Sequence, residues 1–107
     1  MDNLQSQELI EETINNNDMV LLYFGNKTCS VCVDMKPKVE GILGRYPEIK
    51  SVYIDVEQSP EIGIKHSIFT IPAILFFTEG KETIREARYI SIKDIDMKIS
   101  RYYDLIM

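Results

Sequence analysis

The chain has 107 residues, of which 45% are apolar and 27% are charged, and its formal net charge is −5. This size and composition predict one small domain over residues 1–107 with its own hydrophobic core. The negative charge disfavours nucleic acid as a partner, because phosphate binding needs a basic stripe. No apolar run approaches the ~20 residues of a membrane helix, and no basic, apolar leader is visible. We therefore expect a cytoplasmic monomer that binds neither nucleic acid nor membrane.

The first part of the chain predicts a helix, a strand and a second, longer helix. Residues 6–16 place apolar side chains at helical spacing behind Ser6, a good N-cap residue. Residues 19–24 are continuously apolar, as expected for a central strand covered on both faces. The longer helix starts near Cys29, and Pro37 is expected to interrupt and kink it because proline lacks an amide donor.

The middle of the chain predicts a strand and a short helix. Residues 51–55 have the pattern of a strand. Ser59, Pro60 and Glu61 then form a good helix start, with a capping hydroxyl, proline at the first position and an early acid. The helix is expected to stop near His66, which we interpret as a surface histidine remote from the cysteines.

The last part of the chain predicts a hairpin and a helix. Residues 73–78 and 83–90 form its two strands, with a turn at Glu79 and Gly80 between them. The second strand carries several charges, which suit the edge of a sheet because they block pairing with other chains. Ser91 is expected to cap a final helix with one buried apolar stripe.

The chain has only two cysteines, Cys29 and Cys32, and they stand where the apolar strand meets the long helix. In a reducing compartment such a CxxC pair is more often catalytic or metal-binding than structural. A closed zinc site needs four ligands and one CxxC supplies two, so no metal and no other cofactor are expected. Pro72 opens a later strand, and this combination is typical of a thiol–disulfide exchange site.

The position of Cys29 predicts that it is the attacking thiol. Unpaired amides and the helix dipole at a helix N-terminus favour an anion, and they can lower a cysteine pKa from ~8.5 into the ~3.5–7.5 range. The thiolate of Cys29 would attack a substrate disulfide, and Cys32, one helical turn later, would resolve the mixed disulfide. Two unreactive thiols that merely pack are the alternative.

The order and spacing of six motifs resemble the thioredoxin family from about residue 6 to residue 103. These are the apolar strand, the CxxC pair, helical Pro37, Ile54-Asp55, Ile71-Pro72 and the hairpin at residues 78–82. The resemblance implies a thioredoxin-like α/β fold with a mixed four-stranded sheet, or five strands if a short N-terminal strand is present. It implies the strand order second, first, third, fourth, with the first two parallel and helices on both faces.

The resemblance also implies roles around the dithiol. Pro72 would be a cis-proline that presents the backbone of Ile71 to a substrate strand, although a plain strand-opening turn is the alternative. The implied partners are oxidised protein substrates and an electron donor of the thioredoxin-reductase type.

The chain departs from typical thioredoxins at the site itself. It has no tryptophan, and Thr28, Ser30 and Val31 stand where the family has the Trp, Gly and Pro of Trp-Cys-Gly-Pro-Cys. Ser30 could donate to the thiolate or simply start the helix. The buried acid of the family falls on Tyr23, a poor base at neutral pH, and the lysine that faces this acid falls near Ser51.

Tyr23 could hydrogen-bond the site or fill core space, and Lys27 could favour the thiolate, steer acidic partners or be a solvated loop residue. The leading hypothesis is a protein-disulfide reductase. A glutaredoxin-like, glutathione-dependent reductase is the first alternative, because Thr70-Ile-Pro is close to the pattern of that family. A binding module that keeps the fold without strong redox activity is the second.

Overall fold

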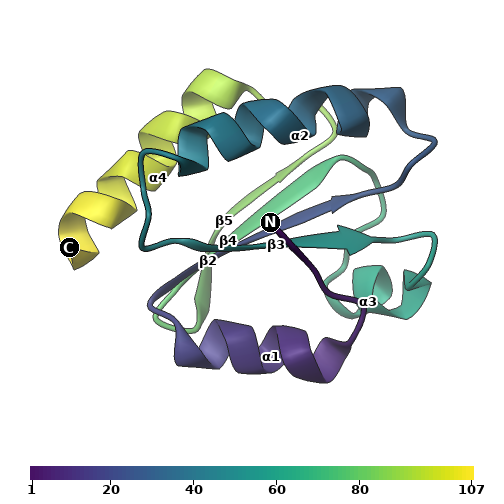
Figure 1. Cartoon of the computed structure of the whole chain (residues 1–107), viewed down its shortest axis with the longest axis horizontal. Coiled ribbons are helices and arrows are strands. Elements are labelled where there is room, and N and C mark those ends of the chain that lie inside the picture. The colour runs from purple at the N-terminus through teal and green to yellow at the C-terminus, as the bar shows by residue number, and fades with distance from the viewer.

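The computed structural model describes residues 1–107 as a twisted sheet with helices on both faces, α2 and α4 on one and α1 and α3 on the other (Figure 1). In chain order the elements are β1 (Asp2–Asn3), α1 (Gln7–Asn16), β2 (Met19–Gly25), α2 (Ser30–Leu43), β3 (Lys50–Asp55), α3 (Pro60–Lys65), β4 (Ala73–Thr78), β5 (Lys81–Ala87) and α4 (Ile92–Ile106).

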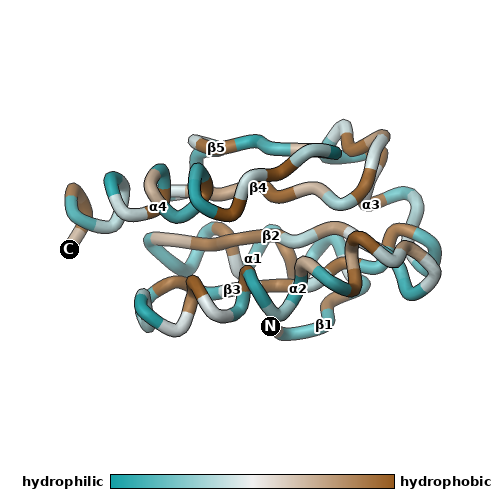
Figure 2. Tube along the Cα trace, turned by 90° about the horizontal axis from the view of Figure 1, so that it is seen from above, coloured by the Kyte–Doolittle hydropathy of each residue, from teal (hydrophilic) through white to brown (hydrophobic).

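The sheet has the strand order β1-β3-β2-β4-β5 (Figure 2). β3 is parallel to β2 and to β1, whereas β4 is antiparallel to both of its neighbours. The predicted order of the four long strands is confirmed, and β1 is the short fifth strand that the sequence left open. β1 extends the sheet by pairing Asp2 with Val52 and Asn3 with Tyr53.

The helices cover both faces because β2 is apolar at every position. Side chains alternate between the two faces of a strand, so an unbroken apolar run requires a cover on each side. Val20, Leu22 and Phe24 belong to a core cluster that contains residues of α1 and α3. Leu21 and Tyr23 belong to a second cluster, with residues of α2 and α4.

Two of the three predicted helix caps are present. The Ser6 hydroxyl accepts a hydrogen bond from the Leu9 amide at 3.3 Å, and the Ser91 hydroxyl accepts one from the Asp94 amide at 3.2 Å. The third prediction is wrong, because Ser59 makes no side-chain cap and is buried at 4% exposure. Its backbone at φ −134°, ψ 67° lies outside the extended conformation that the capping residues Ser6 and Ser91 adopt.

Three further expectations are corrected. α2 runs through Pro37 as one helix, so the expected interruption is wrong, and the expected kink stays a prediction. β5 spans Lys81–Ala87 and not residues 83–90. It ends early because the chain turns at Arg88, where φ is +72°. His66 is not a free surface side chain: its ring lies 5.9 Å from that of Phe24 and 6.4 Å from that of Phe77, and its Nε2 is buried without a hydrogen-bond partner.

None of the helices combines the length and apolar character needed to cross a membrane.

Candidate active site

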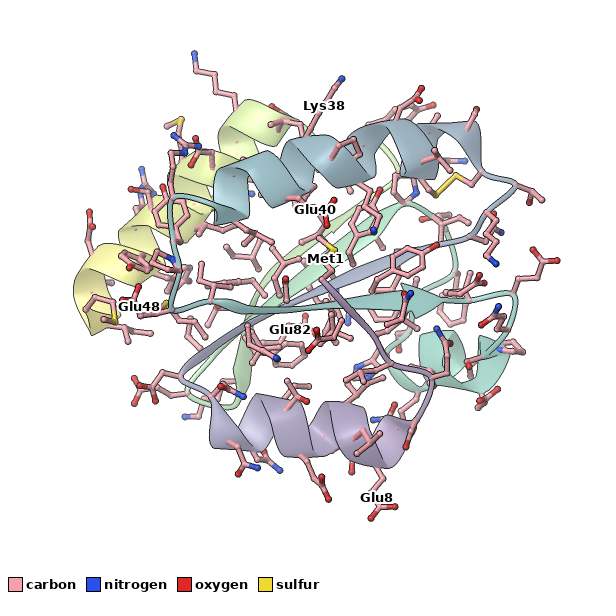
Figure 3. The ribbon with its side chains drawn as sticks, viewed as in Figure 1. Met1, Glu8, Lys38, Glu40, Glu48 and Glu82 are labelled. Carbon is pink, nitrogen blue, oxygen red and sulfur yellow. A yellow bond between two sulfur atoms is a disulfide. The ribbon has the colours of Figure 1, made fainter.

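Cys29 and Cys32 form a disulfide at the beginning of α2, visible as the yellow bond in Figure 3. Their Cα atoms are 5.2 Å apart. Cys29 is the N-cap residue of the helix, and its Sγ accepts a hydrogen bond from the Cys32 amide at 3.2 Å. Cys29 is half-buried, whereas Cys32 is only 2% exposed. The two cysteines therefore occupy unequal environments, and Cys29 is the more exposed of the pair.

The end of β2 approaches Cys32 closely because residue 25 is glycine. A Cβ atom at Gly25 would lie 3.0 Å from Cys32 Cβ and 3.3 Å from Cys32 Sγ. Gly25 is not among the site residues predicted from the sequence. A glycine at the end of an otherwise apolar strand was the available signal, since such a glycine often marks a close approach of another part of the chain.

Tyr23 lies beneath the dithiol and is fully buried. Its hydroxyl donates a hydrogen bond of 2.6 Å to the carbonyl oxygen of Cys32. Burial, with a smaller contribution from Tyr53, raises the pKa of Tyr23 to about 12. Tyr23 therefore both fills the core and holds the first turn of α2, and it stays protonated at neutral pH.

The residue that pairs with Tyr23 on β3 is Tyr53. In the parallel register Tyr23 pairs with Tyr53, and Ser51 pairs with Leu21. The rings of Tyr23 and Tyr53 have their centroids 6.1 Å apart. Two phenols thus lie side by side at the position of Tyr23, where the family pattern predicted an acid.

A surface hollow of about 350 Å³ reaches Cys32 from the side of β3 and α2. Lys27, Lys36 and Tyr53 are among its lining residues, and Lys36 Nζ lies 5.4 Å from the centroid of the Tyr53 ring. Glu40 closes its far side, next to the ammonium group of Met1 at 3.6 Å (Figure 3). This hollow gives water a route toward the buried sulfur.

Pro72 lies at the same end of the sheet as the dithiol loop. β4 begins directly after it, and the register pairs Ala73 with Phe24, the residue before Gly25. The peptide bond between Ile71 and Pro72 is cis. Pro72 is buried and Ile71 is half-buried.

The remaining predicted site residues lie on the surface around the disulfide. The hydroxyl and the amide of Thr28 both donate to Asn26 Oδ1 at 3.1 Å, so Asn26 shapes this loop, a role the sequence analysis missed. Ser30 is exposed and makes no side-chain hydrogen bond. Val31, between the two cysteines, is 53% exposed.

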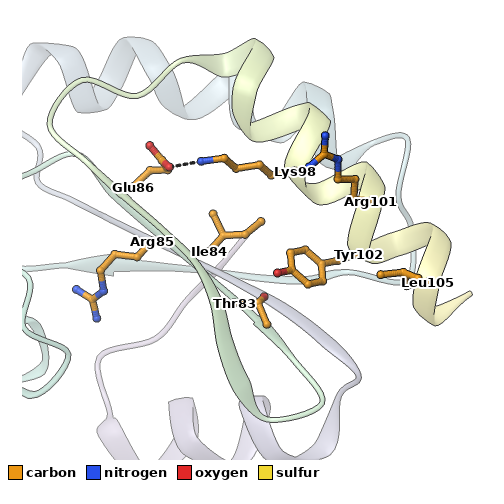
Figure 4. A pocket seen from close by; sticks show the side chains of 8 residues that line it. All are labelled: Thr83, Ile84, Arg85, Glu86, Lys98, Arg101, Tyr102 and Leu105. Carbon is orange, nitrogen blue, oxygen red and sulfur yellow. Dashed lines mark hydrogen bonds and ion pairs between the residues drawn. The ribbon is translucent and has the colours of Figure 1, made fainter.

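The largest surface cavity, about 530 Å³, lies elsewhere, between β5 and α4 (Figure 4). Glu86 and Lys98 form an ion pair of 2.6 Å across it. Arg85 points away from it, toward the carbonyl oxygen of His66 at 2.8 Å (Figure 4). The residues that line this cavity include neither cysteine nor histidine, so the cavity is separate from the Cys29–Cys32 disulfide.

A disulfide at the N-terminus of a helix, a cis-proline at the same end of the sheet and this strand order define a thioredoxin-fold protein with a redox-capable CxxC pair. The sequence profile of the family described as Thioredoxin matches residues 2–100. The chain therefore belongs to the thioredoxin family.

Known relatives agree with this assignment. The chain is 31% identical over 105 residues to Thioredoxin-like protein YdfQ of Bacillus subtilis strain 168, covering 98% of this chain and 94% of that protein. It is 29% identical over 94 residues to a thioredoxin of Chlamydia trachomatis, with 88% of each chain covered. The X-ray structure of Fasciola hepatica thioredoxin superposes with a TM-score of 0.87 at 28% identity, covering 95% of this chain and 99% of that one. Family membership and a Cys29–Cys32 pair at disulfide distance support thiol–disulfide redox activity.

Proposed function

We propose that the chain is a protein-disulfide reductase in which Cys29 attacks and Cys32 resolves. The observation that carries this proposal is the asymmetry of the two cysteines. Cys29 is half-buried and its Sγ accepts a hydrogen bond from the Cys32 amide, which favours its thiolate, whereas Cys32 is buried. The more exposed, amide-stabilised cysteine suits attack, and a buried neighbour suits resolution.

The reaction transfers two electrons and two protons from the dithiol to the substrate. The Cys29 thiolate forms a bond to one sulfur of the substrate disulfide, and the other substrate sulfur leaves as a thiolate that takes up a proton. Cys32 then loses its proton and attacks Cys29 Sγ. The bond between Cys29 and the substrate breaks, the second substrate thiol is released, and the Cys29–Cys32 disulfide remains.

We propose supporting roles for the residues around the disulfide. Ile71, held by Pro72, offers its backbone to an extended substrate segment beside the dithiol loop. Thr28, Ser30 and Val31 tune the stability of the thiolate through the shape of the loop and the first turn of α2.

Tyr23 holds that turn through the Cys32 carbonyl. Lys27 lies in the hollow that reaches Cys32, where its positive charge favours a thiolate. We also propose that residues 1–107 act as one domain, as a monomer in the cytoplasm, on oxidised proteins. An electron donor of the thioredoxin-reductase type would return the disulfide to the dithiol.

Trapping tests the assignment of the two cysteines. The Cys32→Ser variant should accumulate mixed disulfides with an oxidised protein substrate, and the Cys29→Ser variant should not. Alkylation of the reduced wild type near neutral pH should modify Cys29 first. Equal alkylation rates of the two thiols, or trapping by Cys29→Ser, would contradict the assignment.

Two measurements separate this function from its alternatives. Turnover of a glutathione mixed disulfide faster than that of an oxidised protein would favour the glutaredoxin-like function. The reduction potential of the Cys29–Cys32 couple should be low, near the ~−270 mV of reducing thioredoxins, and a value near ~−120 mV would indicate an oxidant instead. If no protein disulfide oxidises the reduced Cys29–Cys32 pair, the remaining hypothesis is a binding module without redox activity.

A further inference from the structure

A second hollow, about 380 Å³ in volume, lies beside the disulfide on the face opposite to Lys27 and Lys36. Its lining comes from the first turns of α2 and from the turn between β5 and α4, namely Val31, Met35, Arg88, Tyr89, Ile90 and Ser91. Val31, the residue between Ser30 and Cys32, is part of this lining, so the hollow borders the CxxC segment although neither cysteine lines it. Tyr89, at 88% exposure, forms its outer wall.

The backbone holds Arg88 at this hollow in an unusual conformation. Its φ of +72° lies in the left-handed region, which side-chain-bearing residues rarely adopt. The Arg88 amide donates to the Pro72 carbonyl at 2.9 Å, which ties this turn directly to the cis-proline. A non-glycine residue kept in such a conformation next to a reactive site is a reason to look for a function of its side chain.

The guanidinium group of Arg88 is available to a ligand. Arg88 is exposed and forms no ion pair, whereas Arg45 and Arg85 pair with carboxylates. It lies 5.8 Å from the centroid of the Tyr89 ring, at the rim of the hollow. No carboxylate lines this hollow, and Asp34, the residue before Met35 on α2, is not part of it.

We propose that this hollow selects the substrate: it binds a protein segment that carries a large apolar side chain and an acidic residue next to its disulfide cysteine. The apolar side chain contacts Val31, Met35 and Tyr89, and the acidic group pairs with Arg88. This inference rests on the proposed reductase function and adds a substrate class to it. The attraction is local and opposes the net charge of −5, which by itself repels acidic substrates.

Symmetric peptides test the proposal without an assumption about chain direction. Each peptide has a central cysteine held in a mixed disulfide with 2-mercaptoethanol. A leucine flanks the cysteine on each side, and the next residue on each side is glutamate, glutamine or lysine, one type per peptide. The rate constant for reduction by the dithiol form of the protein is measured, with dithiothreitol removed after pre-reduction. The neutral bis(2-hydroxyethyl) disulfide serves as a reference for the redox chemistry itself.

The wild type should reduce the glutamate peptide faster than the lysine peptide, by roughly threefold at low ionic strength. The ratio should approach one at ~1 M salt, where the screening length falls to ~3 Å. Replacing both leucines by alanine should slow reduction, and Tyr89→Ser should reduce this leucine preference.

Charge reversal locates the effect. Arg88→Glu should invert the ratio of the glutamate and lysine peptides, and Arg88→Gly, which suits the left-handed backbone, should bring it near one. Lys81→Glu is the matched control, because it changes the net charge equally at the opposite end of the β4–β5 hairpin. Lys81→Glu should leave both the ratio and the reference rate unchanged.

The possible failures are distinguishable. If the wild type reduces bis(2-hydroxyethyl) disulfide but treats the glutamate and lysine peptides alike, the substrate class is wrong and the reductase function stands. If Lys81→Glu shifts the ratio as much as Arg88→Glu does, net charge rather than Arg88 decides, and the inference is overturned. If neither the reference nor any peptide is reduced, the reductase function itself fails.

Discussion

Tyr23 sets the chemical problem of the resolving step. Cys32 must lose its proton inside an apolar setting, and burial raises the pKa of a thiol. Tyr23 cannot take this proton at neutral pH, since its own pKa is raised to about 12. We expect solvent that enters through the hollow lined by Lys27 and Lys36 to accept the proton. The resolving rate should therefore keep rising with pH past neutrality.

Tyr23→Asp should speed the resolving step near pH 7, because a carboxylate can accept the proton of Cys32. The variant should also lose roughly 2–5 kcal/mol of unfolding free energy, since it leaves a cavity and places a carboxylate in the core. Stopped-flow reduction of a model disulfide and denaturant titration measure the two effects. Tyr23→Asn is the matched control, similar in size but unable to accept the proton, and it should not be faster. Equal rates and pH profiles for wild type and Tyr23→Asp would show that another group is the base.

Gly25 and Gly41 form a natural pair for testing the close approach at the disulfide. Gly25→Ala places a Cβ atom 3.0 Å from Cys32 Cβ and should lower the unfolding free energy by about 1–3 kcal/mol. Gly41→Ala meets nothing within 4 Å and lies in α2, so it should raise stability by about 0.5–1 kcal/mol. Urea denaturation of both variants provides the comparison. An unchanged or more stable Gly25→Ala protein would contradict the packing described here.

The sequence predicted the cysteine pair and Pro72 because their spacing along the chain is itself the signal. Gly25 and Tyr53 could not be assigned in this way. Which residue faces Tyr23 depends on the register between β2 and β3, and packing of the whole sheet sets that register. The family motifs place only the usual lysine, near Ser51, which lies two residues from Tyr53 on the same side of the strand.

At the scale of elements, the α4 cap offers a clean test. Ser91→Ala removes the hydrogen bond from the Asp94 amide and should lower the unfolding free energy by about 1 kcal/mol. Ser100→Ala makes the same chemical change inside the same helix, where the hydroxyl has no hydrogen bond, and should change stability by less than about 0.5 kcal/mol. Thermal or urea unfolding distinguishes them. A Ser100→Ala protein at least as destabilised as Ser91→Ala would show that the cap is not important.

Long, strongly patterned elements were predictable and short or bent ones were not. β2 and β4 are almost entirely apolar, and α1 and α4 have a capping serine before a periodic face, so each carries its own signal. β1 has two residues and no period, and it exists only because β3 offers it an open edge. β5 ends early at the turn of Arg88, a backbone conformation that a sequence containing arginine gives no reason to expect.

For the whole molecule, His66 gives stability a pH dependence. Burial, then the charge of Arg85, lowers the pKa of His66 below 6.5, against a smaller opposing effect of Glu82 and Glu11. Between these two pKa values the unfolded chain binds a proton that the folded chain does not, so stability is lost as the pH falls below about 6.5. The contribution is fully present above that pH.

His66→Phe should flatten this part of the profile while keeping an aromatic ring against Phe24 and Phe77. Urea denaturation at about pH 7.5 and pH 5.5 gives the stability change for each protein, and carboxylate titration is common to both. The wild type should lose more stability over this range than the variant. A variant that loses as much as the wild type would show that His66 does not titrate differently in the two states.

β2 and β4 are fully buried in the folded protein, and they become exposed to other chains when the protein unfolds. Each is a run of at least six residues without charge or internal proline and rich in β-forming side chains, which is the composition of amyloid-prone segments. Asp18 and Pro72 stand directly before the two runs and act as their gatekeepers. Heating should therefore end in aggregation at high protein concentration, and the apparent melting temperature should depend on the scan rate.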